Sequence, residues 1–276
     1  MNRTHQLRTL LGTGACHIGP GVFDGLSARI AEAAGMPFAH ASGGAIARSI
    51  GYPDIGLVTM TEMLARIGEM TDAVRIPVVA DADTGYGNAL NAARTARAFR
   101  RAGVAALHVE DQVFPKKCGH HDGLEVIPAA EMADKLRAMK DAVGDDLVLI
   151  ARTDAVRVEG LGRALERMEG YIAAGSDIAF VEALATPEMI RAAGALDAPK
   201  LINQSAASSG LPVGLSELGA LGFALAVYPS DFQRACIHAM DELAAELRRC
   251  GESVALRDRL ASDARRDALV DTQRHD

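Results

Sequence analysis

An α/β barrel of eight parallel strands, each followed by a helix, is the fold that the sequence predicts. The first observation is length: the chain has 276 residues, and such barrels commonly run to ~250. The second is an alternation of short apolar runs with longer segments of helical period, which is typical of βα units in a parallel sheet. The third is that nearly every apolar run ends in a polar residue. In a TIM-type (β/α)8 barrel those strand ends share one mouth, where active sites lie.

Eight apolar runs are expected to be strands, and the segments that follow them to be helices. The strands are expected at 15–19, 38–42, 77–81, 106–110, 147–152, 178–182, 200–203 and 225–228. The helices are expected at 24–34, 60–71, 88–101, 128–143, 161–174, 187–195, 216–222 and 231–249. Glycines that can end a helix at positive φ stand at Gly35, Gly103, Gly144, Gly175 and Gly222. Pro128 and Pro187 are expected in first turns, with Thr186 as an N-cap.

These elements predict one domain over residues 1–276, with its core at about 15–250 and a solvated helical tail at 251–276. The net charge is −7, and basic runs with interleaved aromatic side chains are missing, so no nucleic-acid partner is expected. No run reaches the ~18 apolar residues of a membrane span. The four cysteines show no CxxC spacing, which argues against a zinc site or a disulfide framework. We therefore expect a soluble protein of a reducing cytoplasm.

Three acidic residues follow two neighbouring predicted strands. Asp81 and Asp83 are two residues apart and could share a face, and Glu110 ends the next strand. Three carboxylates at one mouth repel one another unless a cation neutralises them, and oxygen ligands suit Mg²⁺ or Mn²⁺. A 2-hydroxy or 2-oxo carboxylate on such an ion would have its oxygen polarised. The alternative is that these acids cap helices or pair with arginines.

Cys118 lies in a loop of unusual charge. Lys116 and Lys117 precede it, and Gly119 and His120 follow it. Neighbouring cations favour a reactive thiol, and a glycine lets a loop close over a ligand. Cys118 could serve as acid, base or nucleophile with His120 as its partner, or it could be an inert thiol.

Two further groups suit an anionic ligand. Arg152, near the end of a predicted strand, offers a forked donor for a carboxylate or an oxyanion, with a surface ion pair as the alternative. Ser42, Gly43 and Gly44 combine a hydroxyl with unobstructed backbone N–H groups, which suits a carboxylate.

Seven runs together resemble the isocitrate lyase/phosphoenolpyruvate mutase superfamily. They are GVFDGLS at 21–27, SGG at 42–44, PDIG at 53–56, DADTGYG at 81–87, HVEDQ at 108–112, KKCGH at 116–120 and ARTD at 151–154. The likeness covers about residues 15–250, and the KKCGH loop resembles the lyase branch, which includes 2-methylisocitrate lyase and 2,3-dimethylmalate lyase. A carboxyphosphonoenolpyruvate mutase shares that loop.

The resemblance implies Mg²⁺-dependent cleavage of a carbon–carbon bond in a 2-hydroxy di- or tricarboxylate, giving a 2-oxoacid and a second carboxylate. It implies a barrel whose C-terminal helix is swapped between subunits of a homotetramer. The metal set that it implies is Asp81 as the closest ligand, with Asp54, Asp83 and Glu110 holding the waters of the ion. Cys118 would be the general acid, and His40, where several relatives carry Tyr, could take the hydroxyl proton. The substrate-binding set that it implies is Ser42, Gly43, Gly44, Arg152, Gly119, His120, Glu182, Asn203 and Ser205.

Two departures from the family pattern bear on the substrate. After Asn203, relatives carry an acidic residue where this chain has the run QSAASSG at 204–210. Many relatives also place a Lys near position 124, which is Leu124 here. The distal group of the substrate could therefore differ from that of methylisocitrate. The alternatives are an oxaloacetate hydrolase, a decarboxylase or a phosphonate-type mutase on the same fold, and a silent carboxylate-binding protein.

Overall fold

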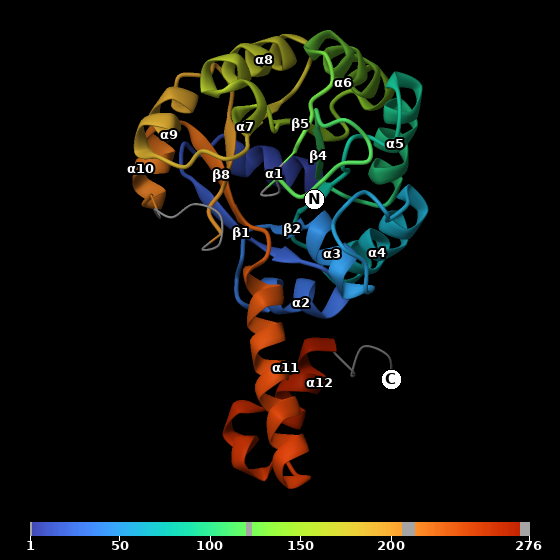
Figure 1. The fold of residues 1–276 in the computed structure, drawn as a ribbon, viewed down its shortest axis with the longest axis vertical. Coiled ribbons are helices and arrows are strands. Elements are labelled where there is room, and N and C mark those ends of the chain that lie inside the picture. The colour runs from blue at the N-terminus through green and yellow to red at the C-terminus, as the bar shows by residue number, and fades with distance from the viewer. Residues whose placement is uncertain (1, 120–122, 206–212, 271–276) are drawn as a thin grey trace.

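The computed structural model describes residues 2–119, 123–205 and 213–270, and its centre is a closed parallel barrel (Figure 1). The strands follow one another around the barrel in sequence order, and the last pairs with the first. They are β1 (His17–Val22), β2 (Ala39–Ala41), β3 (Val78–Asp81), β4 (Ala106–Glu110), β5 (Val148–Thr153), β6 (Ile178–Val181), β7 (Lys200–Asn203) and β8 (Phe223–Tyr228). The predicted (β/α)8 barrel is confirmed.

Helices surround the barrel on its outside, and the last two extend away from it (Figure 1). They are α1 (Arg3–Leu11), α2 (Gly25–Ala33), α3 (Gly43–Ser49), α4 (Met60–Ala73), α5 (Ala89–Arg101), α6 (Ala129–Val143), α7 (Val156–Glu159), α8 (Leu161–Ala173), α9 (Pro187–Gly194), α10 (Leu215–Ala220), α11 (Asp231–Cys250) and α12 (Asp263–Val270), with a 3₁₀ turn at Val254–Arg259. All five predicted helix-ending glycines have positive φ. Thr186 caps α9 through Met189 as predicted, whereas Pro128 is itself the N-cap of α6.

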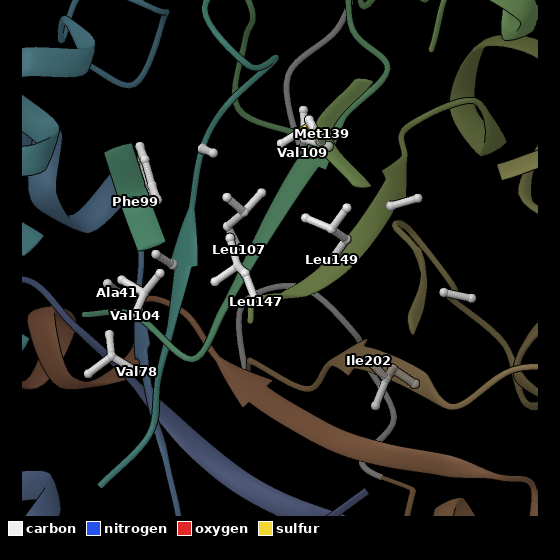
Figure 2. Close-up of a cluster of buried hydrophobic side chains, with 14 of the residues drawn as sticks. Ala41, Val78, Phe99, Val104, Leu107, Val109, Met139, Leu147, Leu149 and Ile202 are labelled. Carbon is white, nitrogen blue, oxygen red and sulfur yellow. The ribbon is translucent and has the colours of Figure 1, made fainter. Parts of the chain in front are cut away.

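The outer core lies between the strands and the surrounding helices (Figure 2). Leu107 and Val109 of β4 are fully buried there, together with Phe99 of α5 and Met139 of α6. Side chains that alternate outward along a strand meet the apolar stripe of each helix, so both faces of the parallel sheet are covered. This packing fixes the strand ends that form the mouth.

The first strand is the main correction to the predicted fold. It runs over His17–Val22, not 15–19. Gly19 and Gly21 lie in this strand. Both positions require glycine, because a Cβ on Gly19 would lie 2.2 Å from the Phe38 ring and a Cβ on Gly21 would lie 2.0 Å from the Pro229 carbonyl oxygen. A run that resembles a turn is therefore a strand that lets its neighbours approach closely.

Helix α1 was not predicted, and it packs against the end of the barrel opposite the mouth. Leu7 is fully buried against Phe38, Val79 and Ala105 at the beginnings of the strands. The core therefore begins before residue 15.

The C-terminal segment leaves the barrel (Figure 1). Helix α11 projects away from it, and Ile237, Met240 and Leu247 on α11 are exposed. Helix α12 packs beside α2, and the described tail also holds the 3₁₀ turn and short non-helical links at 251–253 and 260–262. The swap of this segment between subunits stays a prediction, since the structure holds one chain. In the described part of the chain, every helix is too short or too polar to cross a membrane.

Candidate active site

A cavity of about 390 Å³ opens at the carboxyl ends of the strands. Most of the predicted site residues line it: His40, Ser42, Gly44, Asp54, Asp81, Cys118, Gly119, Arg152, Glu182 and Asn203. These residues come from six strands and the loops behind them, and the barrel brings them together. Gly43, Asp83, Glu110 and Ser205 lie behind the lining, and His120 is outside the described residues.

Asp81, at the end of β3, is buried and held by two backbone donors. Gly43 donates its N–H to Oδ2 at 3.2 Å, and Asp83 donates its N–H to Oδ1 at 3.0 Å. Burial by itself would raise the pKa of Asp81. His108, Lys116 and Arg152 lower it by more than burial raises it, so the pKa of Asp81 lies below its usual range. Gly43 thus positions a carboxylate instead of offering its amide to a ligand, and a Cβ there would lie 2.7 Å from Oδ2.

Two of the predicted metal-site acids are paired with Lys116, which the sequence had suggested only as a cation near Cys118. Nζ of Lys116 lies 2.5 Å from Oδ1 of Asp54 and 2.8 Å from Oδ1 of Asp83. Burial opposes the charge on Lys116, but Asp83, Glu110, Asp54 and Asp81 raise its pKa, so it stays protonated. Asp83 itself has φ +46°, and burial raises its pKa to about 6 despite the lysine.

Glu110 and Arg152 form the next part of the wall. Nε of Arg152 lies 3.4 Å from Oε2 of Glu110, and the guanidinium donates two hydrogen bonds to Asp154, at 3.0 and 2.8 Å. Oε1 of Glu110 is buried and has no hydrogen-bond partner among the described atoms. Burial raises the pKa of Glu110 well above its usual range, against the effect of Arg152. A cation or a water placed beside Oε1 would relieve that penalty.

These acids can bind a hard divalent cation, but with few direct protein ligands. Within residues 2–119, 123–205 and 213–270, no three acid, His or Cys side chains converge closely enough to hold an ion by themselves. Asp81 lines the cavity and is ionised, so it can supply one protein oxygen. Mg²⁺ commonly takes one or two carboxylates and completes its shell with water and ligand oxygens. The donor set therefore suits Mg²⁺ bound mainly through water.

Cys118 is half-buried, and it lines the cavity from the loop after β4. The loop is anchored on its inner side, since Gln112 accepts the N–H of Lys117 at 2.9 Å and donates to its carbonyl at 3.0 Å. Gly119 passes close to the opposite wall, where a Cβ would lie 2.7 Å from Nη2 of Arg152 and 2.8 Å from Oδ1 of Asp154. Only glycine allows this approach without displacement.

His40 contacts a second histidine that sequence reasoning missed. The two Nε2 atoms of His40 and His108 are 3.0 Å apart, and Nδ1 of His108 is 3.6 Å from Oδ1 of Asp81. Burial lowers the pKa of His40 to about 3 and that of His108 to about 4, so both rings are neutral at neutral pH. Neutral His40 keeps a lone pair that can accept a proton. The HVEDQ run placed His108 at this strand end, although its orientation needed the barrel.

The wall at β6 and β7 carries the remaining predicted residues. Nδ2 of Asn203 donates to Oε1 of Glu182 at 3.3 Å, and Oε2 of Glu182 is buried without a hydrogen-bond partner among the described atoms. Oγ of Ser205 contacts Asp231 and lies 3.1 Å from Oγ of Ser230. Ser205 therefore joins the segment after β7 to the start of α11.

Asp111, next to Glu110, anchors the site from behind. It is fully buried, and it accepts hydrogen bonds from Oγ1 of Thr153 and the hydroxyl of Tyr171, both at 2.8 Å, and from the N–H of Asp154 at 3.0 Å. Since Asp154 holds Arg152, this network fixes the arginine that faces the cavity.

Comparison with known proteins identifies the family of the chain. A family model described as phosphoenolpyruvate phosphomutase matches residues 7–248. Over 233 residues the chain is 40% identical to 2,3-dimethylmalate lyase of Eubacterium barkeri, a match that covers 83% of this chain and 81% of that protein. Over 225 residues it is 40% identical to 2-methylisocitrate lyase of Bacillus subtilis strain 168, covering 81% and 74%.

Solved structures show the same fold. A crystal structure of 2,3-dimethylmalate lyase, described as a PEP mutase/isocitrate lyase superfamily member, has a TM-score of 0.92 and 30% identity, covering all of this chain and 93% of that one. Oxaloacetate acetylhydrolase with 3,3-difluorooxalacetate has a TM-score of 0.93 and 30% identity, covering 99% and 95%. Phosphonopyruvate hydrolase with oxalate and Mg²⁺ has a TM-score of 0.90 and 27% identity, covering 100% and 97%.

Proposed function

The chain belongs to the phosphoenolpyruvate mutase/isocitrate lyase superfamily, and from this premise we propose that it cleaves a carbon–carbon bond in a 2-hydroxy di- or tricarboxylate. The products would be a 2-oxoacid and a second carboxylate. The lyases of Eubacterium barkeri and Bacillus subtilis, each 40% identical, support this reaction class. The observation that carries it is that Cys118 lines the same cavity as Asp81 and Arg152. The thiol, the guanidinium and the carboxylate would thus face the same substrate molecule.

The oxoacid half of the substrate would bind between α3 and β5. Arg152 is held by Asp154 and directs its charge into the cavity, where it can pair with a carboxylate. Ser42 caps α3, accepting the N–H of Ala45 at 3.4 Å, and its own O–H remains available to the ligand. Bound this way, the 2-hydroxyl faces the His40 side of the cavity.

Mg²⁺ would be held by Asp81, with Asp54, Asp83 and Glu110 acting through water, and when bound it would polarise the substrate oxygen. A bound oxalate and Mg²⁺ are part of the related phosphonopyruvate hydrolase structure. The ion would add positive charge beside Glu110, whose Oε1 is buried and without a hydrogen-bond partner.

The proton transfers can be assigned to this chain's own residues. His40, kept neutral by burial, would accept the hydroxyl proton as the oxygen forms a carbonyl and the adjacent carbon–carbon bond breaks. The electron pair of that bond passes to the departing carbon. Cys118 would give its S–H proton to that carbon, which completes the second carboxylate product.

The test is a screen of 2-hydroxy dicarboxylates and tricarboxylates with Mg²⁺, with oxoacid release followed by reduction. Cys118→Ser should lower turnover by orders of magnitude and leave Mg²⁺ binding unchanged in a calorimetric titration. Cys236→Ser is the matched control, because Cys236 is exposed on α11 and does not line the cavity. Wild-type turnover in Cys118→Ser would remove the thiol from the chemistry, and no cleavage of any compound would refute the proposal.

A second candidate is hydrolysis of oxaloacetate, which the oxaloacetate acetylhydrolase structure at 30% identity favours. The products separate the two reactions. Oxaloacetate hydrolysis incorporates one water and yields oxalate and acetate, whereas the lyase reaction incorporates none. Isotope-labelled water followed by mass spectrometry of the products distinguishes them.

We also propose a homotetramer. The apolar side chains that α11 exposes support contact with another copy of the chain. Light scattering should give four times the 29.0 kDa chain mass, and a monomer at micromolar concentration would contradict the proposal.

A further inference from the structure

The cations that line the cavity fall into two groups. The inner pair is neutralised: Lys116 lies within 2.8 Å of two carboxylates, and Arg152 is paired with Asp154 and Glu110. The outer group is Arg48, Lys117 and Arg234, which are exposed and form no ion pair with a carboxylate within the described residues. The outer part of the cavity therefore carries positive charge that no carboxylate of residues 2–119, 123–205 and 213–270 pairs with.

Two of these outer cations lie on the same side of the mouth. Arg48 is on α3 and Arg234 is near the start of α11. The two helices are joined at this point, because Nε2 of Gln233 donates to the carbonyl oxygen of Ala45 at 2.8 Å. Ala45 is one turn before Arg48, and Gln233 is adjacent to Arg234. The bond therefore holds the two arginine-bearing segments together.

Arg48 is partly fixed in place before any ligand binds. Its Nη1 donates to the carbonyl oxygen of Gly44 at 2.9 Å, and among the described atoms the rest of the guanidinium has no acceptor. A Cβ on Gly44 would lie 2.9 Å from that Nη1, so the glycine permits the arginine to fold over the first turn of α3. A donor that is already held loses less conformational entropy on binding.

We propose that Arg48 is a specificity-determining residue, forming with Arg234 a subsite for a carboxylate that lies beyond the bond to be cleaved. The proposal rests on the proposed function, in which Arg152 binds the oxoacid half. A 2-hydroxy dicarboxylate such as 2,3-dimethylmalate carries its two carboxylates on the two carbons whose bond is cleaved, so both stay at the inner end of the cavity. A tricarboxylate such as 2-methylisocitrate carries a third carboxylate one carbon further out, and this is the group that the outer subsite binds. Arg48 therefore selects tricarboxylates over dicarboxylates.

The test measures binding without turnover, in the Cys118→Ser protein with Mg²⁺. Three probes are titrated calorimetrically: oxalate, 2,3-dimethylmalate and 2-methylisocitrate. Adding Arg48→Ala should weaken 2-methylisocitrate about 10- to 100-fold, the range for one charge-assisted hydrogen bond. Oxalate and 2,3-dimethylmalate should change less than about threefold. Arg48→Lys should recover part of the loss, because it restores the charge without the fork.

Arg94→Ala is the matched control, since Arg94 is exposed on α5 and does not line the cavity. It removes the same charge and should leave all three affinities unchanged. An equal loss for all three probes in Arg48→Ala, no loss for any, or failure of 2-methylisocitrate to bind would overturn the subsite. Arg48-dependent binding in a protein that cleaves nothing when Cys118 is intact would instead refute the proposed function and leave the subsite standing.

Discussion

Replacement of Lys116 by methionine should destabilise the protein strongly, because it leaves two carboxylates buried without their cation. The lysine, Asp54 and Asp83 side chains are 5%, 9% and 6% exposed. At an effective dielectric constant of ~20, one ion pair at ~4 Å is worth about 4 kcal/mol. Breaking a buried pair typically costs about 3–5 kcal/mol after the remaining charge has relaxed or taken up a proton. We expect Lys116→Met to lose about that much free energy of unfolding.

Urea unfolding followed by circular dichroism measures the loss, first in a chelator and then with millimolar Mg²⁺. Because a divalent ion supplies the missing positive charge, Mg²⁺ should restore part of the stability of Lys116→Met. Asp54→Asn added to Lys116→Met should also restore part of it, since one buried charge is removed. Lys117→Met is the control: Lys117 is exposed, its Nζ donates only to the Gly123 carbonyl among the described atoms, and its loss should be below about 0.5 kcal/mol. A loss under 1 kcal/mol in Lys116→Met, or one insensitive to Mg²⁺ and to Asp54→Asn, would refute the reasoning.

Three further predictions follow from the site. Gly119→Ala should reduce kcat/KM by on the order of 10- to 100-fold in the oxoacid-release assay, because its Cβ would lie 2.7 Å from Nη2 of Arg152 and displace it; unchanged kinetics would contradict the close approach. Burial lowers the pKa of His40 to about 3 and that of His108 to about 4. The contribution of the two neutral rings to the free energy of unfolding is therefore fully present above pH 6.5. It is lost as pH falls from 6.5 toward 4, by up to about 1.4 kcal/mol per pH unit for each ring. His40→Asn should flatten that acid limb in urea titrations at several pH values, and an unchanged slope would argue against the neutral pair. Asp111→Asn should lower the free energy of unfolding by about 1–3 kcal/mol in the same assay, because a fully buried acceptor of three hydrogen bonds becomes partly a donor; a neutral result would show that the network is dispensable.

The sequence predicted the fold well where its signals were local. The strands Ala106–Glu110 and Lys200–Asn203 have the predicted bounds, because each is a short apolar run that ends in a polar residue. It failed where the reason for a residue is a distant neighbour. From the sequence alone, Gly21 resembles a turn residue. The structure shows that it must be glycine because Pro229 fills the space that a side chain would need.

Which residues line the candidate site was also largely predictable from the sequence, but which of them form ion pairs with one another was not. Polar residues at strand ends must converge in a parallel barrel, so Asp81, Arg152 and Glu182 could be assigned to the mouth from the sequence. The ion pairs of Lys116 depend on how one loop folds against a residue 62 positions earlier. No local pattern encodes that contact, and the neighbourhood of Arg48 and α11 was hidden for the same reason.

The packing of α1 against the closed end of the barrel has a practical consequence. Leu7 lies among the beginnings of the strands, and the ligand cavity lies at their other ends. A sensor surface or a fluorescent reporter joined through the amino terminus would sit on the far side of the molecule from the entrance. When the amino terminus is attached to a sensor surface, the entrance of the cavity faces the solution. Binding of small carboxylates can then be screened directly on that surface.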